Sequence, residues 1–124
     1  MIEDRNTVVV MTTINQPNEK VSDWFDITKN KTIVVGDNKT PQGWNHNKCN
    51  YYSISDQNSS DFRISNDLPE NHYTRKNLAY LFAIKSGASR IIDTDDDNFP
   101  YVIEWEKLLK SEFECFEHAP SENV

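Results

Sequence analysis

Short apolar runs alternate with amphipathic stretches over residues 7–100 of the chain. Residues 7–13, TVVVMTT, and residues 31–35, KTIVV, are rich in β-branched side chains and are predicted to be buried strands. Residues 89–94 form a third run of this kind. Residues 17–27 and 73–86 carry apolar side chains at helical spacing, which predicts two amphipathic helices. Weaker patterns predict a short strand over residues 51–54, a short helix over 55–62 and an amphipathic helix over 101–118.

This order of elements, β-α-β-(β)-α-β-α, predicts an α/β fold. Strands that are apolar along nearly their whole length and are joined through helices are typical of a doubly wound, mostly parallel sheet of the Rossmann-like kind. We expect about four strands flanked by helices. The whole chain, 1–124, is predicted to be a single domain, with a core over residues 7–100, a C-terminal helix over 101–118 and a tail over 119–124.

The net charge of the chain argues against some classes of binding partner. The formal net charge of the 124 residues is −7. A broad nucleic-acid surface needs a basic patch, so this charge argues against nucleic acid as a partner. No apolar run approaches the roughly 18 residues that a membrane-spanning helix needs, and the charged N-terminus does not resemble a signal peptide. We therefore expect a cytoplasmic protein without a membrane span.

Polar side chains lie where the predicted strands end, which is where open α/β sheets bind their ligands. The first strand ends on Thr12 and Thr13 and is followed by Asn15. Asp37 follows the second strand. The third strand runs directly into an acidic segment, residues 93–97, with the sequence DTDDD. These three segments are the candidates for a binding site.

The acidic segment suits a divalent cation. Because alternate side chains of an extended strand share a face, Asp93, Asp95 and Asp97 are expected to point one way and Asp96 the other. Carboxylates that converge at a strand end provide hard oxygen ligands for Mg²⁺ or Mn²⁺, and such an ion keeps open positions for phosphate oxygens. The alternative interpretation is an acidic turn that is simply solvated.

A calcium-binding helix-loop-helix is a rival interpretation of the same segment. The three alternating Asp residues and Glu104 occupy the first, third, fifth and twelfth positions of such a loop. However, Asn98 stands where that loop has an invariant Gly, and Pro100 stands where it makes a short β contact. Residues 89–92 also have the pattern of a strand and not of a helix.

A zinc site is a further alternative. The pairs His46-x-x-Cys49 and Cys115-x-x-His118 together contain the four ligands of a Cys₂His₂ site. The two pairs lie far apart in poorly patterned segments. The other interpretation is two free thiols and two solvated histidines, since a disulfide does not suit the expected compartment.

A polar segment at the start of the helix over 73–86 is the second candidate for ligand binding. Arg75 and Lys76 are followed by Asn77, and two cations at a helix N-terminus oppose the helix dipole. Side chains placed there can contact the base, ribose or phosphates of a nucleotide. The alternative is that both cations are solvated on the helix face.

The segment TRKNLAYLFAIKSGASRIIDTDDDN resembles nucleotide-sugar glycosyltransferases, in which an Arg/Lys-Asn helix precedes a strand and an Asp-rich DxD motif. More narrowly, VVVMTTINQP, IVVGDNKTP and LPENHYTRKNLAYLFAIKSGASRIIDTDDDN resemble the STELLO-like family. These proteins are of the GT-A type, and the Asp triad is similar to that of plant reversibly glycosylated polypeptides, the UDP-arabinose mutases. The resemblance spans roughly residues 7–100.

The resemblance implies a site for a nucleotide-diphosphate sugar, with a UDP-sugar as the expected donor and Mn²⁺ or Mg²⁺ as the cofactor. It implies that the end of the first strand contacts the nucleotide, that the residue after the second strand meets the base, and that the DxD residues hold ribose and metal. The nucleotide-binding residues implied are Thr12, Thr13, Asn15, Asp37, Arg75, Lys76, Asn77, Asp93 and Asp95, and the metal ligands implied are Asp95 and Asp97.

Three function classes stay open. The first is a glycosyltransferase-like domain, and the second is a non-catalytic binding or regulatory module that retains only the donor half of the fold. The third is an interaction domain stabilised by calcium or zinc. The acceptor half of a GT-A enzyme lies well beyond its DxD motif, so we expect inefficient transfer by this chain alone, unless a second copy supplies the missing wall. Catalytic residues are not identified, because Glu104, Glu106 and His118, the available bases, lie in no recognisable motif.

Overall fold

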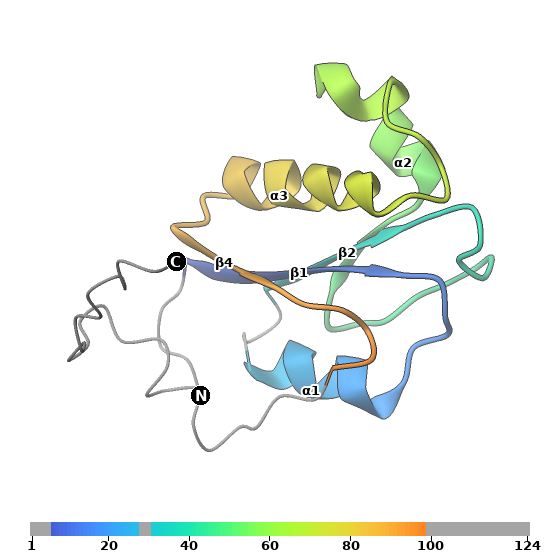
Figure 1. Cartoon of the computed structure of the whole chain (residues 1–124). Helices are drawn as coiled ribbons and strands as arrows, with labels where there is room; N and C mark the ends of the chain where they lie inside the picture. Colours follow the sequence, from blue (N-terminus) through green and yellow to red (C-terminus); the bar gives the residue numbers. More distant parts are fainter. Residues whose placement is uncertain (1–5, 28–30, 99–124) are drawn as a thin grey trace, which may run out of the picture.

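A computed structural model of the chain describes residues 6–27 and 31–98 (Figure 1). Its strands lie within one or two residues of the predicted ranges. The predicted helix over 101–118 and the tail lie outside the described residues. The elements are β1 (Thr7–Thr13), α1 (Glu19–Ile27), β2 (Thr32–Gly36), β3 (Asn50–Tyr52), α2 (Ile54–Asn58), η1 (Arg63–Asn66), η2 (Tyr73–Arg75), α3 (Lys76–Lys85) and β4 (Arg90–Asp93).

The four strands form one parallel sheet in the order β3-β2-β1-β4. The chain adds β2 and β3 on one side of β1 and then returns to place β4 on the other side. Helix α1 covers one face of the sheet and α3 covers the opposite face (Figure 1). The prediction of an α/β, Rossmann-like parallel sheet is confirmed, and the strand order reverses between β1 and β4.

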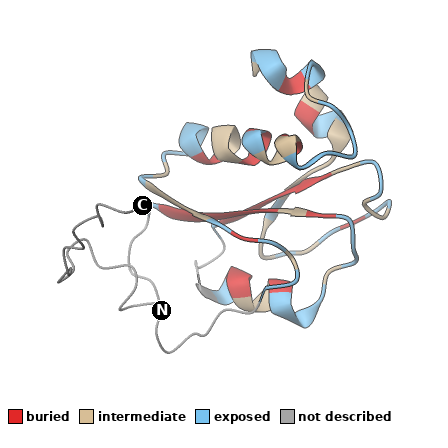
Figure 2. Cartoon of the chain, in the orientation of Figure 1, coloured by how far each residue is buried: buried red, intermediate tan, exposed pale blue. Residues whose placement is uncertain are grey.

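The strand side chains alternate between two apolar clusters, as the period of an extended chain requires. On the α1 face, Val9 and Met11 of β1 pack with Trp24 and Phe25 of α1. No helix connects β2 to β3, and the loop between them instead contributes Trp44, which is buried in the same cluster. Figure 2 shows the buried residues concentrated along the strands. The sequence pattern did not assign Trp44 to the core.

On the α3 face, the side chains of β1 and β2 that point away from α1 form the second cluster. Helix α3 contacts them through small residues. Val8 and Val10 of β1 pack against Ala79 and Ala83 of α3, with Ile33 and Val35 alongside. Both alanines are fully buried. Small side chains at these positions let the helix backbone lie close to the sheet, and this close packing fixes which side chains of α3 face the end of the sheet.

The helix ends follow local capping rules. Helix α1 begins at Glu19 and not at Pro17, because the Asn18 side chain accepts a hydrogen bond from the Val21 N–H at 3.1 Å. Helix α2 is shorter than predicted and is preceded by a capping box between Ser53 and Asp56. The predicted helix over 73–86 begins with the η2 turn, continues as α3, and is followed by Gly87 at φ +92°, a left-handed conformation that glycine adopts without strain.

Candidate functional site

The strand register brings the three predicted polar segments to one edge of the sheet. Thr13 at the end of β1 pairs with Gly36 at the end of β2, so Asp37 emerges beside it. On the other side of β1, Asp93 pairs with Val10, and the Thr94 N–H donates to the Val10 carbonyl at 3.1 Å. The residues after Thr94 therefore run alongside the last residues of β1. The site lies at the carboxyl ends of the strands, next to the point where the strand order reverses.

A pocket of about 370 Å³ opens at this edge. Five of the predicted site residues line it: Thr12, Thr13, Asp37, Asp95 and Asp97. Asn15 and Lys76 lie beside it and donate to Asp96 and Asp95 of the acidic segment, and Asp93 accepts from Lys76. Six further lining residues were not among the predicted site residues: Ile14, Lys39, Asn71, His72, Tyr73 and Asp96.

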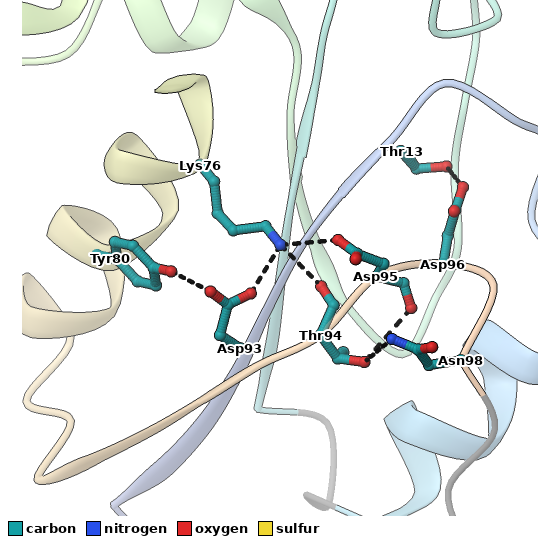
Figure 3. A network of polar contacts seen from close by, with 8 residues as sticks. All are labelled: Thr13, Lys76, Tyr80, Asp93, Thr94, Asp95, Asp96 and Asn98. Atoms are coloured by element: carbon teal, nitrogen blue, oxygen red, sulfur yellow. Dashed lines mark hydrogen bonds and ion pairs between the residues drawn. The ribbon is translucent and has the colours of Figure 1, made fainter. Parts of the chain in front are cut away.

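Lys76 lies among the carboxylates of the acidic segment (Figure 3). Its ammonium donates to Asp93 Oδ1 at 2.7 Å, to Asp95 Oδ1 at 2.9 Å and to the Thr94 carbonyl at 3.1 Å. The Tyr80 hydroxyl, one turn further along α3, donates to the second oxygen of Asp93. The side chain of Lys76 is only 14% exposed, whereas that of Asp95 is 62% exposed. A cation from the protein itself thus offsets part of the repulsion between the carboxylates.

These contacts shift the titration of the groups involved. Burial lowers the pKa of Lys76, but the hydrogen bonds to Asp93 and Asp95 outweigh burial, so its pKa is raised. Burial raises the pKa of Asp93, but the hydrogen bonds from Lys76 and Tyr80 outweigh it, so the pKa of that carboxyl is lowered. The hydrogen bond to Asp93, with burial, raises the pKa of Tyr80. All three groups therefore keep their paired protonation states at neutral pH.

Asp96 corrects the predicted alternation of the acidic segment. Strand β4 ends at Asp93, and the following residues turn, with the Asn98 N–H directed at the Asp95 carbonyl. Alternation does not continue beyond the strand, so Asp96 does not point away from the site. Its carboxylate accepts hydrogen bonds from Thr13 Oγ1 at 2.6 Å and from Asn15 Nδ2 at 3.0 Å. Asp96 therefore ties the acidic segment to the end of β1 and lines the pocket.

The carboxylate of Asp37 holds a neighbouring loop. It accepts the backbone N–H of Asn71 at 2.7 Å and that of His72 at 3.1 Å. Asn71 has a φ of 54°, a left-handed conformation that Asn tolerates better than most residues. The contact of Asp37 holds the segment that carries Tyr73, a residue that is 79% exposed and lines the pocket.

Arg75 and Asn77 do not line the pocket. Arg75 is only 2% exposed and is directed into the interior of the protein. Its Nε donates to Gln57 Oε1 at 2.9 Å, and its Nη1 donates to the Leu68 carbonyl at 3.0 Å. Asn77 is exposed on α3. Of the three adjacent residues predicted to contact a nucleotide, only Lys76 reaches the acidic segment.

Two tryptophans of the core anchor the loops around the site. The indole N–H of Trp24 donates to the Asn98 carbonyl at 3.1 Å, and that of Trp44 donates to the Asn15 carbonyl at 2.9 Å. Each ring is buried in the cluster on the α1 face while its polar atom holds a backbone oxygen. The apolar core therefore determines where the acidic segment and the end of β1 lie.

The structure bears on the two alternative metal sites, the calcium-binding loop and the zinc site, to different extents. Residues 90–93 are a strand, so a calcium-binding helix-loop-helix around the acidic segment is wrong. Of the possible zinc ligands, Cys115 and His118 lie outside the described residues. The His46 ring packs on Phe25 with centroids 4.4 Å apart, and burial raises the pKa of the Cys49 thiol to about 12. The zinc prediction stays open, because only two of its four proposed ligands are described.

Comparison with known proteins identifies the relatives of this chain. It is 32% identical over 88 residues to the probable glycosyltransferase STELLO2 of Arabidopsis thaliana, and 30% identical over 88 residues to STELLO1 of the same plant. The chain is therefore related to the STELLO-like proteins over part of their length. Each alignment covers 71% of this chain but only 12% and 11% of the relatives, so the chain spans a small part of their length. No family model matches the chain, and no solved structure gives a significant match.

A divalent cation, as the STELLO-like resemblance implies, can be tested against the residues present. Asp95 and Asp97 both line the pocket and offer the oxygen ligands that Mg²⁺ and Mn²⁺ prefer. Within residues 6–27 and 31–98, no three acidic, His or Cys side chains gather into a group that could hold an ion. Mg²⁺ is commonly bound by one or two carboxylates together with substrate phosphates. In this STELLO-like segment, Asp95 and Asp97 are thus two candidate ligands, and a bound ion would need further ligands such as substrate phosphates.

The sequence predicted that the chain has no membrane-spanning helix, and the described helices can be compared with this prediction. Over the described ranges, none of the helices is both long enough and apolar enough to cross a bilayer.

Proposed function

We propose that the pocket binds the nucleoside diphosphate of a nucleotide sugar, with a UDP-sugar as the donor. The observation that supports this most directly is the place of the pocket. It lies at the carboxyl edge of a parallel sheet, beside the reversal of strand order, and its wall includes Asp95 and Asp97 of the DxD motif. The relationship to probable glycosyltransferases favours a sugar nucleotide over other nucleotides.

The exposed ring of Tyr73 suits the base of this ligand. It stacks on the His72 ring with centroids 4.4 Å apart, and the backbone of His72 is held by Asp37. A rigid, exposed aromatic face on a pocket wall offers stacking to a planar base, an interaction that contributes about 1–3 kcal/mol in nucleic-acid complexes. In this arrangement Asp37 acts through the backbone of the loop, and the aromatic ring makes the contact with the base.

The diphosphate belongs at the opposite wall, beside the acidic segment. Asp95 and Asp97 would hold Mn²⁺ or Mg²⁺, which supplies the positive charge that offsets the diphosphate. The Thr13 hydroxyl and the Asn15 side-chain amide hold Asp96, so the turn that carries both proposed ligands is fixed to β1. These side chains keep the proposed metal ligands beside the pocket before any ligand arrives.

A panel of thermal melts tests this proposal. UDP, GDP and UDP-sugars would each be added with and without Mn²⁺. A ligand at about 100 times its Kd stabilises the folded state by about 2.7 kcal/mol, so we expect a rise of several degrees in Tm for UDP with Mn²⁺ and a smaller rise for either alone. Absence of any shift with every nucleotide would contradict nucleotide binding. Equal shifts with and without Mn²⁺ would contradict the metal.

Catalysis is a separate part of the proposal. We propose transfer of the sugar as the activity in which this donor site takes part, and a non-catalytic nucleotide-binding or regulatory module as the alternative. Release of sugar from a radiolabelled donor, followed at several protein concentrations with water and simple sugars as acceptors, separates the two. Steady turnover supports an enzyme. Nucleotide binding without turnover at any concentration supports the module.

A further inference from the structure

We propose that Lys76 is a built-in competitor of the divalent cation, because the ammonium and the metal ion share Asp95. This inference rests on the proposed function, since it concerns the loading of the same site. Lys76 makes metal binding weak in the absence of a nucleotide and thereby makes metal and nucleoside diphosphate bind together.

The geometry of Lys76 supports such a role. An ammonium has three N–H donors, and the described acceptors of Lys76 are also three: Asp93, Asp95 and the Thr94 carbonyl. All three belong to one short segment of the chain, and the side chain is 14% exposed (Figure 3). The ammonium is therefore an enclosed, fully paired cation within the acidic segment and not a solvated surface charge.

Asp95 has to serve both cations. It lines the pocket as the first carboxylate of the DxD motif, and its Oδ1 already accepts from Lys76 at 2.9 Å. A metal ion on the same oxygen displaces the ammonium. A metal ion on the other oxygen leaves a single and a double positive charge on opposite sides of one carboxylate, where they repel each other. In either arrangement Lys76 lowers the affinity of the site for the metal ion alone.

Lys76 is not lost from the site when Asp95 turns to the metal. Asp93 accepts from Lys76 through one oxygen and from Tyr80 through the other, and the Thr94 carbonyl gives a further acceptor. The ammonium therefore stays next to the pocket after the exchange. Its charge then favours the diphosphate, which attracts both the ammonium and the metal ion. Metal and nucleotide are thus expected to raise each other's affinity by the same factor.

The test is the Mn²⁺ affinity of Lys76→Met, measured by calorimetry with and without saturating UDP. Methionine keeps the apolar stem of the side chain and removes the charge. Without nucleotide, we expect Lys76→Met to bind Mn²⁺ about 10-fold more tightly than the wild type, a difference of about 1.4 kcal/mol. The factor by which UDP strengthens Mn²⁺ binding should fall by a similar amount. A purely structural role for Lys76 would not change this coupling factor.

Lys20→Met is the matched control. The Lys20 ammonium lies beside the same turn, 3.4 Å from the Asp97 carbonyl, but it contacts no carboxylate among its described hydrogen bonds. Its removal changes the general charge of this edge by the same amount, and we expect a change of less than about 3-fold in Mn²⁺ affinity. Lys76→Gln provides a second variant should Lys76→Met fail to fold, as judged by its melting curve, and the same increase is expected for it.

The outcomes separate this inference from the proposed function. Unchanged or weaker Mn²⁺ binding by the folded Lys76 variants, with a wild type that binds Mn²⁺ and UDP together, would overturn the role of Lys76 alone. An equal gain in Lys20→Met would show that only general charge is involved and would also overturn it. If no variant, the wild type included, binds Mn²⁺ with UDP, the proposed donor site itself is wrong.

Discussion

Two regions of the molecule surround two cationic side chains that are adjacent in the sequence, Arg75 and Lys76, with opposite kinds of acceptor. Arg75 lies in a buried network with Gln57, Asn58 and the Leu68 carbonyl, all of which offer neutral acceptors. Lys76, the next residue, lies in the acidic segment at the edge of the pocket. The first region is enclosed, while the carboxylates of the second are about half exposed.

The difference shows how a cation of the buried framework can be told apart from a candidate site residue, although both carry a positive charge. The acceptors of Arg75 are the side-chain amides of Gln57 and Asn58 and the Leu68 carbonyl. Gln57 in turn donates to the Gly36 and Tyr52 carbonyls. This chain of bonds links the ends of β2 and β3 to the start of α3. The acceptors of Lys76 are charged, accessible and adjacent to a pocket. Arg75 thus belongs to the buried framework of the fold, whereas Lys76 belongs to the charged edge of the pocket.

The largest effect is expected when the buried region is broken. Arg75→Met leaves Gln57 Oε1 and the Leu68 carbonyl without their donor, and each buried unsatisfied polar group costs about 1–3 kcal/mol. We therefore expect the free energy of unfolding to fall by about 3 kcal/mol, measured in urea. Lys76→Met is the paired control and should lower it by less than about 1 kcal/mol, because its carboxylate partners remain solvated. Similar losses in the two variants would contradict the distinction between the regions.

A smaller change in free energy, confined to binding, is expected when the exposed region is altered. Asp95→Asn removes a proposed metal ligand and should weaken Mn²⁺-dependent UDP binding at least about 10-fold, or about 1.4 kcal/mol, with little change in stability. Asp97→Asn should act in the same direction. Asp61→Asn is the control, because this carboxylate is 94% exposed and pairs only loosely with Lys85 at 3.6 Å. Calorimetry with UDP and Mn²⁺ measures all three, and equal affinity of Asp95→Asn and wild type would contradict the proposed ligands.

The smallest expected effect is the pH dependence of the stability that Asp93 contributes. The pKa of Asp93 lies below its ordinary value of 3.8, so its contribution to stability is present above about pH 4 and is lost as the pH falls through the lowered pKa. The difference in unfolding free energy between wild type and Asp93→Asn should be less than about 1 kcal/mol at neutral pH. It should shrink in urea titrations carried down to about pH 3. A difference that grows on acidification would have the wrong sign for an Asp93 paired with Lys76.

The arrangement of strands was accessible from the sequence because it depends on short-range pattern. The run TVVVMTT can be buried on both faces only as an inner strand, and the alternation of strands with helices then favours parallel pairing. Parallel pairing in turn places Thr13, Asp37 and the acidic segment at one edge. The location of the candidate site thus followed from composition and order alone.

The orientation of individual side chains could not be predicted in the same way. Arg75 and Lys76 are adjacent in the chain, and the packing of Ala79 and Ala83 on the sheet decides which of them turns inward. Asp96 faces the pocket because the chain turns after Asp93, and this turn is held by Thr13 and Asn15. Asp37 is occupied by backbone groups of residues 71–72, far along the chain.

The sequence by itself therefore determined the parallel sheet, the edge at which its polar residues gather, and the relationship to STELLO-like proteins. Only the tertiary structure decided which cation enters the acidic segment, which carboxylates remain accessible, and how Trp44 completes the core in place of a helix. The physical reason is range. Strand and helix patterns arise from residues a few positions apart, whereas each of these decisions depends on a contact between segments that meet only when the sheet and its two faces have packed.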